Sequence, residues 1–524
     1  MSSEIKQIII NSLGLCTQHK KLSALFLGML LALALPPYYH FWAVFVSLSY
    51  ALFLIAKIDS FKTLAAIGYW YGFGFFALGF YWIGNALLVD MAATGWLYPF
   101  VLVLNGAFFG LFTILPFIAT KLSPRVPLKI LLFASVWCLV TEWMRSVIFT
   151  GFPWNPLSSA LAFSPEMLQT LSIWGTYGLS LVLIIVAALP ACWLCNRRLK
   201  HTLWFVLSFV LMVLLGLYGD YVLHAREQVD EGKSIIVRLV QPSIPQSVKW
   251  TPELQETNFN EYIKLSKVED NQYVDFTIWG ETAIPFDLYY DAEHVAKIRR
   301  AVPPNGYLIT GFLRYADGRY YQLYNSFGVI NKKGIVEGIY DKSHLVPFGE
   351  YIPFRKYLPK WVRPLTNTVA EFGRGIQYET IKIDDYPEFA PLICYEIIFS
   401  SQVIRKTDKP KWIIVLTNDG WYGNSSGPYQ HLVAAQMRAV EEGVSVVRSA
   451  NSGISAVINP YGEVVEQIPL KMKGVIDVAV KLDEAHDTWF GKLGNIIPLC
   501  ISVLLLLFVI LSEKIIAYLI HRKS

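Results

Sequence analysis

Apolar residues gather in eight long runs along the chain, separated by short polar stretches. The runs lie at residues 22–38, 41–56, 64–88, 97–120, 129–149, 169–192, 202–224 and 496–519. Most approach the roughly 20 residues that an α-helix needs to cross a bilayer. The run at 41–56 is the weakest, because it is short and begins directly after the stretch Pro36-Pro37-Tyr38-Tyr39-His40, where a tight hairpin would seat it. The pattern predicts a transmembrane bundle of about eight helices.

The block between the last two runs has a different pattern of apolar and polar residues. Short β-rich runs recur in it, at residues 235–240, 276–279, 307–310, 391–393 and 412–416. Several are almost wholly apolar, which is typical of strands buried on both faces of a sheet. Between and after them lie amphipathic stretches with helical spacing, notably residues 430–442. We therefore predict a helical bundle at 1–224 with seven helices, a layered α/β domain at 225–492, and a last transmembrane helix with a short tail at 493–524.

Composition and charge agree with a membrane protein. Hydrophobic residues make up 54% of the chain, charged residues only 16%, and the mean hydropathy is +0.41. Lys and Arg occur in alternate loops, whereas the loops near 38–41, 89–96 and 150–168 contain none. The positive-inside rule then predicts two cytoplasmic termini and an exported 225–492 block. The first run lacks a cleavage site, so we expect a retained helix. Cytoplasmic basic residues account for much of the net charge of +5, and no nucleic-acid partner is needed.

One cysteine stands apart from the other five. Cys394 alone lies outside the apolar segments and the residues that border them. A solitary thiol cannot form a disulfide within its own domain, so nucleophilic chemistry or simple packing remains. Glu281 and Lys342 lie in two further islands of motif-like sequence, at 279–285 and 340–350. Glu281 and Cys394 each follow a predicted strand, where α/β sheets assemble their sites. A carboxylate base, an ammonium group and a thiol together predict acyl transfer.

The order of these motifs supports a resemblance to known families. The 225–492 block resembles the nitrilase, or carbon–nitrogen hydrolase, superfamily, which uses a Glu-Lys-Cys triad on an αββα sandwich. The whole chain resembles the bacterial apolipoprotein N-acyltransferase family. Beyond the triad islands, the likeness includes residues 150–155, 416–423, 427–432, 437–441 and 448–453. The chain departs from the family pattern at Val444 and Phe490, and neither residue belongs to the triad.

The resemblance implies a ping-pong acyltransferase of the bacterial inner membrane, active on its outer face. Cys394 would take an acyl chain from a glycerophospholipid as a thioester. The free amine of diacylglyceryl-cysteine in an apolipoprotein would then accept that chain, in the final step of lipoprotein maturation. The resemblance also implies that Glu281 is the base, that Lys342 stabilises the oxyanion, and that Glu350 holds Lys342 or the acceptor amine.

Other residues carry weaker predictions. Tyr395 and Glu396 would shape the turn after the nucleophile, and the N–H of Tyr395 would help to bind the oxyanion. For Glu350 and Glu396, a structural salt bridge is an equally good interpretation. Three residues are candidates for substrate binding, each with a simpler alternative: Trp250 as a core residue, Arg145 paired with Glu142, and Trp361 in an exposed loop. The basic and aromatic segment 355–365 that contains Trp361 has the composition of an interfacial lid.

We predict neither a metal nor another cofactor. The possible ligands near the motifs are His344, His431 and Glu396, and their spacing fits no common metal pattern. A monomer is favoured. Two other functions share part of the sequence pattern: a membrane-tethered amidase or nitrilase that hydrolyses a small amide, and a transporter or sensor whose exported domain binds a ligand. An acyl adduct on Cys394 would distinguish the transferase from both.

Overall fold

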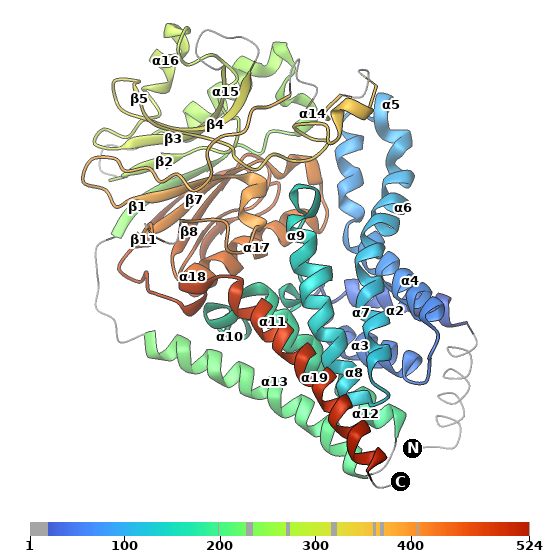
Figure 1. Ribbon diagram of the computed structural model, residues 1–524. Helices are drawn as coiled ribbons and strands as arrows, with labels where there is room; N and C mark the ends of the chain where they lie inside the picture. Colours follow the sequence, from blue (N-terminus) through green and yellow to red (C-terminus); the bar gives the residue numbers. More distant parts are fainter. Residues whose placement is uncertain are drawn as a thin grey trace, which may run out of the picture. The chain divides into compact units, whose positions relative to one another are not determined.

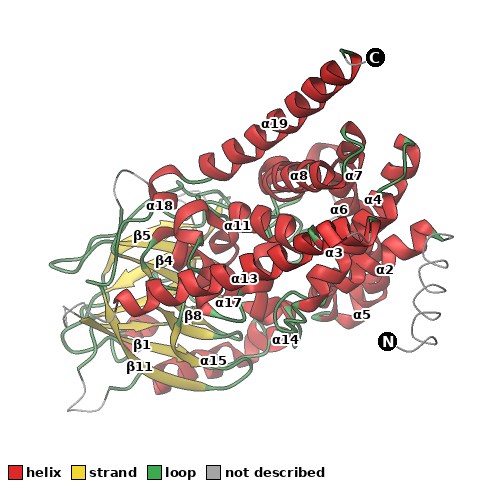
Figure 2. Cartoon of the chain, turned by 90° about the horizontal axis from the view of Figure 1, so that it is seen from below, coloured by secondary structure: helices red, strands yellow, loops and turns green. Residues whose placement is uncertain are grey.

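The computed structural model describes residues 19–196, 199–226, 234–268, 273–315, 322–359, 363–366, 371–405, 407 and 409–522. The chain divides into two compact units (Figures 1 and 2). The helical unit comprises Met1–Tyr81, Leu97–His224 and Leu493–Ser524, and the sheet unit comprises Trp82–Trp96 and Ala225–Lys492. Figure 2 shows that the strands are confined to the sheet unit.

The helical unit contains apolar helices of very different lengths. Its α-helices are α2 (Lys20–Ala32), α3 (Trp42–Ile55), α4 (Phe61–Gly79), α6 (Tyr98–Phe109), α7 (Ile114–Ala119), α8 (Val126–Val136), α9 (Arg145–Val147), α10 (Pro165–Leu168), α11 (Leu171–Ala188), α12 (Pro190–Cys195), α13 (Leu199–Arg226) and α19 (Ile496–His521). Helical turns of other types are η2 (Gly95–Leu97), η3 (Gly110–Thr113), η4 (Thr120–Leu122), η5 (Trp137–Met144), η6 (Ile148–Thr150) and η7 (Leu157–Leu161). Several of these join end to end into longer stretches.

Five such stretches in the described residues are long and apolar enough to cross a membrane. They are Met91–Leu122, Val126–Thr150, Leu171–Cys195, Thr202–Ala225 and Ile496–His521. Helix α4 and the following η1 (Tyr81–Leu88) make a sixth if they are taken as one span with a 45° bend. The first two predicted spans are shorter than expected, because α2 has 13 residues and α3 has 14. At 1.5 Å per residue each reaches about 20 Å, less than the hydrocarbon thickness of a bilayer.

The sheet unit is built from two sheets. The first has the order β11-β1-β2-β3-β4-β5 and the second β10-β9-β8-β7-β6. The strands are β1 (Ser234–Gln241), β2 (Phe276–Ile278), β3 (Tyr307–Tyr315), β4 (Leu323–Ile330), β5 (Val336–Asp341), β6 (Phe389–Ile393), β7 (Trp412–Thr417), β8 (Ser445–Ala450), β9 (Ser455–Ile458), β10 (Val464–Ile468) and β11 (Gly474–Lys481). Strands β1, β2 and β3 are parallel, as are β6, β7 and β8. The five predicted strands correspond to β1, β2, β3, β6 and β7.

The helices of the sheet unit lie outside the two sheets (Figure 1). They are α5 (Met91–Thr94), α14 (Gln246–Lys249), α15 (Pro252–Leu265), α16 (Ala292–Ile298), α17 (Gly427–Glu442) and α18 (Trp489–Leu493), with the single turns η8 (Arg355–Tyr357), η9 (Cys394–Ile398) and η10 (Asp419–Tyr422). One core joins the two sheets, with Val237 and Ile309 packing in it from the first and Ile393 and Ile414 from the second. A second core places Phe259 of α15 against the first sheet. Helix α17 contacts β8 and β9 of the second sheet. The predicted combination of an apolar helical bundle with an αββα sandwich is confirmed.

The segment Trp82–Trp96 packs in the sheet unit although it lies between two apolar helices in sequence. The indole N–H of Trp82 donates to Gln430 Oε1 at 2.9 Å, and Asn85 Nδ2 donates to the carbonyl of Tyr422 at 2.7 Å. The rings of Trp82 and Tyr422 meet edge to face at 4.7 Å. A side chain at Gly427 would collide with Trp82, so this glycine permits the close approach.

Candidate active site

Three strand ends bring Glu281, Lys342 and Cys394 together. Glu281 follows β2, Lys342 follows β5 directly, and Cys394 follows β6 directly. All three are buried, with 7%, 1% and 5% of their surfaces exposed. Strands β2 and β5 belong to one sheet and β6 to the other, so the two facing sheets jointly position the three residues.

Lys342 is bonded to two carboxylates. Its Nζ lies 2.9 Å from Glu350 Oε1 and 3.4 Å from Glu281 Oε1. Asn325 of β4 donates to the same two oxygens, at 2.8 Å to Glu281 and 3.2 Å to Glu350. Glu350 Oε2 also accepts from the backbone N–H of Val346 at 2.8 Å. Glu350 therefore bonds to Lys342 directly. Lys342 and Asn325 each donate to both Glu350 and Glu281.

The surroundings have opposite effects on the ammonium and the thiol. Burial alone would lower the pKa of Lys342, but the charges of Glu350 and Glu281 outweigh it and hold this pKa above its usual range. Burial, together with the charge of Glu281, raises the pKa of Cys394 to about 12, although Lys342 acts in the opposite direction. At neutral pH the site therefore holds a charged lysine and a protonated thiol, and a thiol in this state would need a base to act as a nucleophile.

Cys394 adopts a left-handed backbone conformation, with φ at +53°. Such a conformation is unfavourable for a residue with a side chain and persists only where surrounding contacts impose it. One such contact is His431 of α17, whose Nε2 lies 3.0 Å from the carbonyl oxygen of Cys394. The Nδ1 of His431 lies 2.8 Å from Asp419 Oδ1, and Arg448 pairs with Asp419. Burial and the Arg448 guanidinium lower the pKa of His431. This buried network holds the turn that carries the Cys394 thiol.

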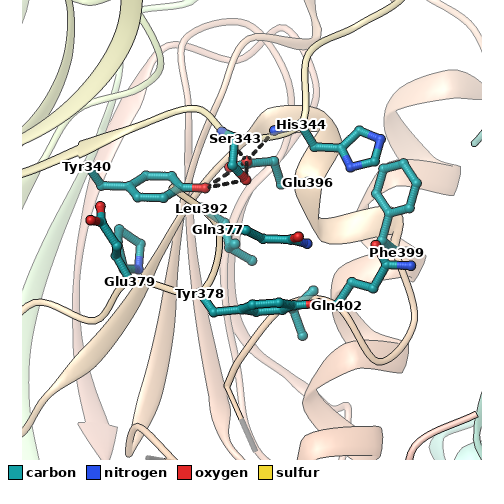
Figure 3. Close-up of a pocket in the computed structure, with 12 residues that line it drawn as sticks. Tyr340, Ser343, His344, Gln377, Tyr378, Glu379, Leu392, Glu396, Phe399 and Gln402 are labelled. Atoms are coloured by element: carbon teal, nitrogen blue, oxygen red, sulfur yellow. Dashed lines mark hydrogen bonds between the residues drawn. The ribbon is translucent and has the colours of Figure 1, made fainter. Parts of the chain in front are cut away.

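Glu396 joins the nucleophile turn to the lysine loop (Figure 3). Its Oε1 accepts from the Tyr340 hydroxyl at 2.7 Å, from the Ser343 N–H and hydroxyl at 2.8 Å, and from the His344 N–H at 3.0 Å. Its Oε2 accepts from the N–H of Ile393 at 2.8 Å. Burial raises the pKa of Glu396, although the bonds from Ile393 and Tyr340 oppose the shift. These contacts favour the structural interpretation of Glu396.

The pocket drawn in Figure 3 is separate from the thiol. It is lined by Tyr340, Ser343, His344, Gln377, Tyr378, Glu379, Pro391, Leu392, Glu396, Phe399, Gln402 and Val403. None of the three triad side chains lines it. Tyr395 is buried beside it, and its ring meets Phe399 edge to face at 5.2 Å.

The three residues predicted to bind substrate lie in different parts of the chain. Trp250 is 37% exposed rather than part of the core, and its ring lies 5.5 Å from Lys249 Nζ. Arg145 is buried in the helical unit and donates to the carbonyls of Thr141 at 2.7 Å and Trp154 at 2.8 Å. Its guanidinium therefore makes main-chain contacts both with η5 and with the segment after η6. Trp361 lies outside the described residues.

The described residues contain one cluster with metal-binding geometry, and it differs from the set considered from the sequence. Donor atoms of Cys394, Asp419 and His431 lie within 4.8 Å of one another. Arg448 already forms an ion pair with Asp419, and His431 faces the carbonyl of Cys394. This balance of charge favours a structural role over cation binding, and the absence of a metal stays a prediction.

Sequence reasoning missed several residues of the site. Asn325, Asp419 and Lys249 were not assigned roles, and His431 was considered only as a possible metal ligand. Asn325 and Lys249 bond to Glu281, whereas His431 bonds to Asp419 and to the carbonyl of Cys394. An amide side chain inside β4 and a lysine directly before a tryptophan look ordinary in sequence. The signal for His431 and Asp419 was stronger, because both lie within the motif stretches 416–423 and 427–432.

Comparisons with known proteins cover both units. The family model described as apolipoprotein N-acyltransferase N-terminal domain matches residues 27–189, and the one described as carbon-nitrogen hydrolase matches residues 236–488. A curated relative from Rhodopseudomonas palustris, named apolipoprotein N-acyltransferase, is 34% identical over 512 residues and covers 94% of each chain. One of the same name from Rickettsia bellii is 36% identical, covering 96% of this chain and 98% of the relative.

Solved structures resemble the sheet unit more distantly. A CN-hydrolase superfamily protein from Xanthomonas campestris is 16% identical, with a TM-score of 0.34, and the match covers 48% of this chain and 94% of that chain. An amidase from Nesterenkonia sp. is 16% identical, with a TM-score of 0.36, covering 50% and 94%. The fold assignment rests on the two sheets described above and on the match to the carbon-nitrogen hydrolase family.

Proposed function

Because the chain belongs to the apolipoprotein N-acyltransferase family, we propose that it transfers an acyl chain from a glycerophospholipid to an apolipoprotein. The acceptor is the N-terminal amine of diacylglyceryl-cysteine, and the intermediate is a thioester on Cys394. The observation that carries this proposal is the convergence of Glu281, Lys342 and Cys394 in one buried site. The acyltransferase class follows from the family, and the role of each residue below is our proposal.

The first half-reaction forms the thioester. The Glu281 carboxylate takes the proton from the Cys394 thiol, and Sγ attacks the ester carbonyl carbon of the phospholipid. The tetrahedral oxyanion lies against the Lys342 ammonium and the backbone N–H of Tyr395. When the carbon–oxygen bond breaks, the departing lysophospholipid oxygen takes the proton from Glu281. The raised pKa of Cys394 explains why a base is required.

The second half-reaction forms the amide. The neutral acceptor amine attacks the thioester carbonyl while Glu281 takes a proton from its nitrogen. The same two donors stabilise the second oxyanion, the carbon–sulfur bond breaks, and the Cys394 sulfur recovers the proton from Glu281. Lys342 is suited to both steps, because the Glu350 carboxylate, which takes no proton in either of them, favours its charged form. Glu350 holds this ammonium in place and is also the nearest candidate to orient the amine.

The family and the long apolar helices identify a protein of the bacterial inner membrane. For its orientation we propose cytoplasmic termini and a periplasmic sheet unit, from the distribution of Lys and Arg in the loops. The short helices α2 and α3 do not change this assignment. A pair of helices that crosses twice and a pair that dips in and returns both leave the chain on the side where it began.

The test is direct detection of the intermediate. The full chain in detergent is incubated with a phospholipid of known acyl composition, and the intact protein is weighed by mass spectrometry. We expect a fatty-acyl mass on Cys394, which a diacylglyceryl lipopeptide then removes as it becomes acylated. Hydrolysis of small amides without such an adduct would identify a tethered amidase instead, and neither activity would point to a ligand-binding domain.

A further inference from the structure

A second lysine lies in the active site and takes no part in the mechanism described so far. Lys249, at the end of α14, is 6% exposed. Its Nζ donates to the carbonyl oxygen of Glu281 at 2.9 Å and to the Thr282 hydroxyl at 2.7 Å. Buried lysines are rare unless they are paired or serve a function, so this placement needs an explanation.

The main chain that Lys249 contacts is strained. Thr282 has φ at +47°, a left-handed conformation that is rare for a β-branched residue. The neighbouring strand β3 accommodates this turn only because position 311 is glycine: a side chain there would come within 2.4 Å of the Thr282 nitrogen. A strained turn next to a proposed base is expected to be held by its surroundings. The two bonds from Lys249 hold it from one side.

Helix α14 reaches two strand ends at once. While Lys249 contacts the turn after β2, Gln246 at the other end of the same helix accepts a hydrogen bond from Asn418 Nδ2 at 2.7 Å. Asn418 follows β7 directly. The single helical turn therefore connects the loop that carries Glu281 to the loop that begins the Asp419 network.

We propose that Lys249 is a positioning residue for the acyl-transfer reaction: it holds the Glu281 turn through two hydrogen bonds, and its ammonium charge favours the ionised form of Glu281. This inference rests on the proposed role of Glu281 as the base.

The electrostatic surroundings of Lys249 agree with this role. Burial lowers the pKa of Lys249 to about 8, while the acidic groups that face it, Glu281 and Cys394, act in the opposite direction. The folded site therefore holds the ammonium form below about pH 8 and loses its charge above. The charges of Lys249 and Glu281 are opposite, so the two groups attract each other in the buried site.

Three substitutions separate the two contributions of Lys249. Lys249→Met removes the charge and both hydrogen bonds, Lys249→Gln keeps an N–H donor without the charge, and Lys249→Arg keeps both. The matched control is Lys333→Met, which removes an exposed lysine from the turn between β4 and β5. Thermal unfolding of each purified full-length variant confirms that it is folded.

The readout is the rate at which iodoacetamide alkylates Cys394, located by peptide mass spectrometry, between about pH 5 and 9. Alkylation needs the thiolate, so the low-pH limb of the pH–rate profile reports how readily the site removes the proton from the Cys394 thiol. We expect Cys394 in Lys249→Met to react at about a tenth of the wild-type rate or below, since two hydrogen bonds are lost. The low-pH limb of its pH–rate profile should move to higher pH, because the site loses a nearby cation. Lys249→Gln should show the same shift in the limb, and Lys249→Arg should restore the wild-type limb.

An unmoved limb in both Lys249→Met and Lys249→Gln would overturn the electrostatic role, and a wild-type rate in Lys249→Met would overturn the positioning role. If Lys249→Met does not fold, Lys249→Gln and Lys249→Arg decide the question by their limbs alone. Iodoacetamide replaces the acyl donor, so this result is independent of the natural substrate. A wild-type chain that is alkylated as described but takes no acyl chain from phospholipid would refute only the proposed function.

Discussion

The side-chain amide of Asn325 donates to the carboxylate of Glu281, with 2.8 Å between Nδ2 and Oε1. The same nitrogen lies 3.2 Å from Glu350 Oε1. One uncharged side chain on β4 therefore joins the proposed base to the carboxylate that holds Lys342. Asn325 itself is almost fully buried, so water cannot readily replace this donor.

Replacing this amide should impair catalysis without touching the triad. Asn325→Leu removes the shared donor from two charged groups and should lower the rate of Cys394 acylation roughly ten- to a hundredfold. Asn325→Asp should be worse, because it adds a third carboxylate beside Glu281 and Glu350. Single-turnover acylation followed by intact-protein mass spectrometry measures both. Asn260→Leu, on the exposed face of α15, is the control, and equal rates in Asn325→Leu and this control would contradict the assignment.

The thiol of Cys394 should be indispensable for both half-reactions. Cys394→Ala should reduce transfer to below about a thousandth of the wild-type rate, because no other cysteine of the sequence lies in the sheet unit. Cys394→Ser should be nearly as inactive, because a hydroxyl is much harder to deprotonate than a thiol. Lysophospholipid release and lipopeptide acylation are measured separately. Substantial turnover by either folded variant would refute the triad.

Glu350 should distinguish the two half-reactions. If it orients the incoming amine, Glu350→Gln should still accumulate an acyl chain on Cys394, while transfer to the lipopeptide slows far more. The adduct is trapped, lipopeptide is added, and the loss of the acyl mass is followed with time. A variant that never becomes acylated would assign Glu350 to the first step, as the residue that holds the Lys342 ammonium 2.9 Å away.

Single cysteines can test the proposed orientation. Lys333→Cys places an exposed thiol in the sheet unit, and Lys57→Cys places one between α3 and α4. A membrane-impermeant thiol reagent should label position 333 from outside intact cells, and position 57 only after the membrane is permeabilised. Peptide mass spectrometry distinguishes these sites from the natural cysteines. The reverse pattern would invert the topology.

The sequence predicted the parts of the fold in which local pattern and tertiary role coincide. Apolar runs such as 412–416 are buried on both faces, so their composition alone indicates strands. Strands β4 and β5 were not predicted because each mixes polar with apolar residues. Asn325 and Ser326 are buried in β4, and exposed residues alternate with partly buried ones along most of β5. A polar residue in a strand is usually exposed, and only the facing carboxylates explain why Asn325 is buried.

Among the proposed functional residues, those within distinctive motifs could be predicted from the sequence, and those that act through tertiary contacts could not. Glu281, Lys342 and Cys394 could be proposed because each lies in a distinctive motif. Lys249 could not, because its importance depends on a bond to a main-chain carbonyl 32 residues later, which leaves no pattern in the sequence. The lengths of α2 and α3 were also overestimated, because hydropathy marks an apolar run without showing where the helix inside it ends.

The segment Trp82–Trp96 limits how this protein can be divided for experiments. A truncated chain of residues 225–492 would contain every strand and all three triad residues, yet it would lack the indole that covers Gly427 and bonds to Gln430. It would also lose the amide that binds the carbonyl of Tyr422, next to the ring that packs against His431. The sheet unit is thus completed by residues encoded more than a hundred positions upstream, and its isolated C-terminal portion would expose an apolar surface close to the nucleophile turn.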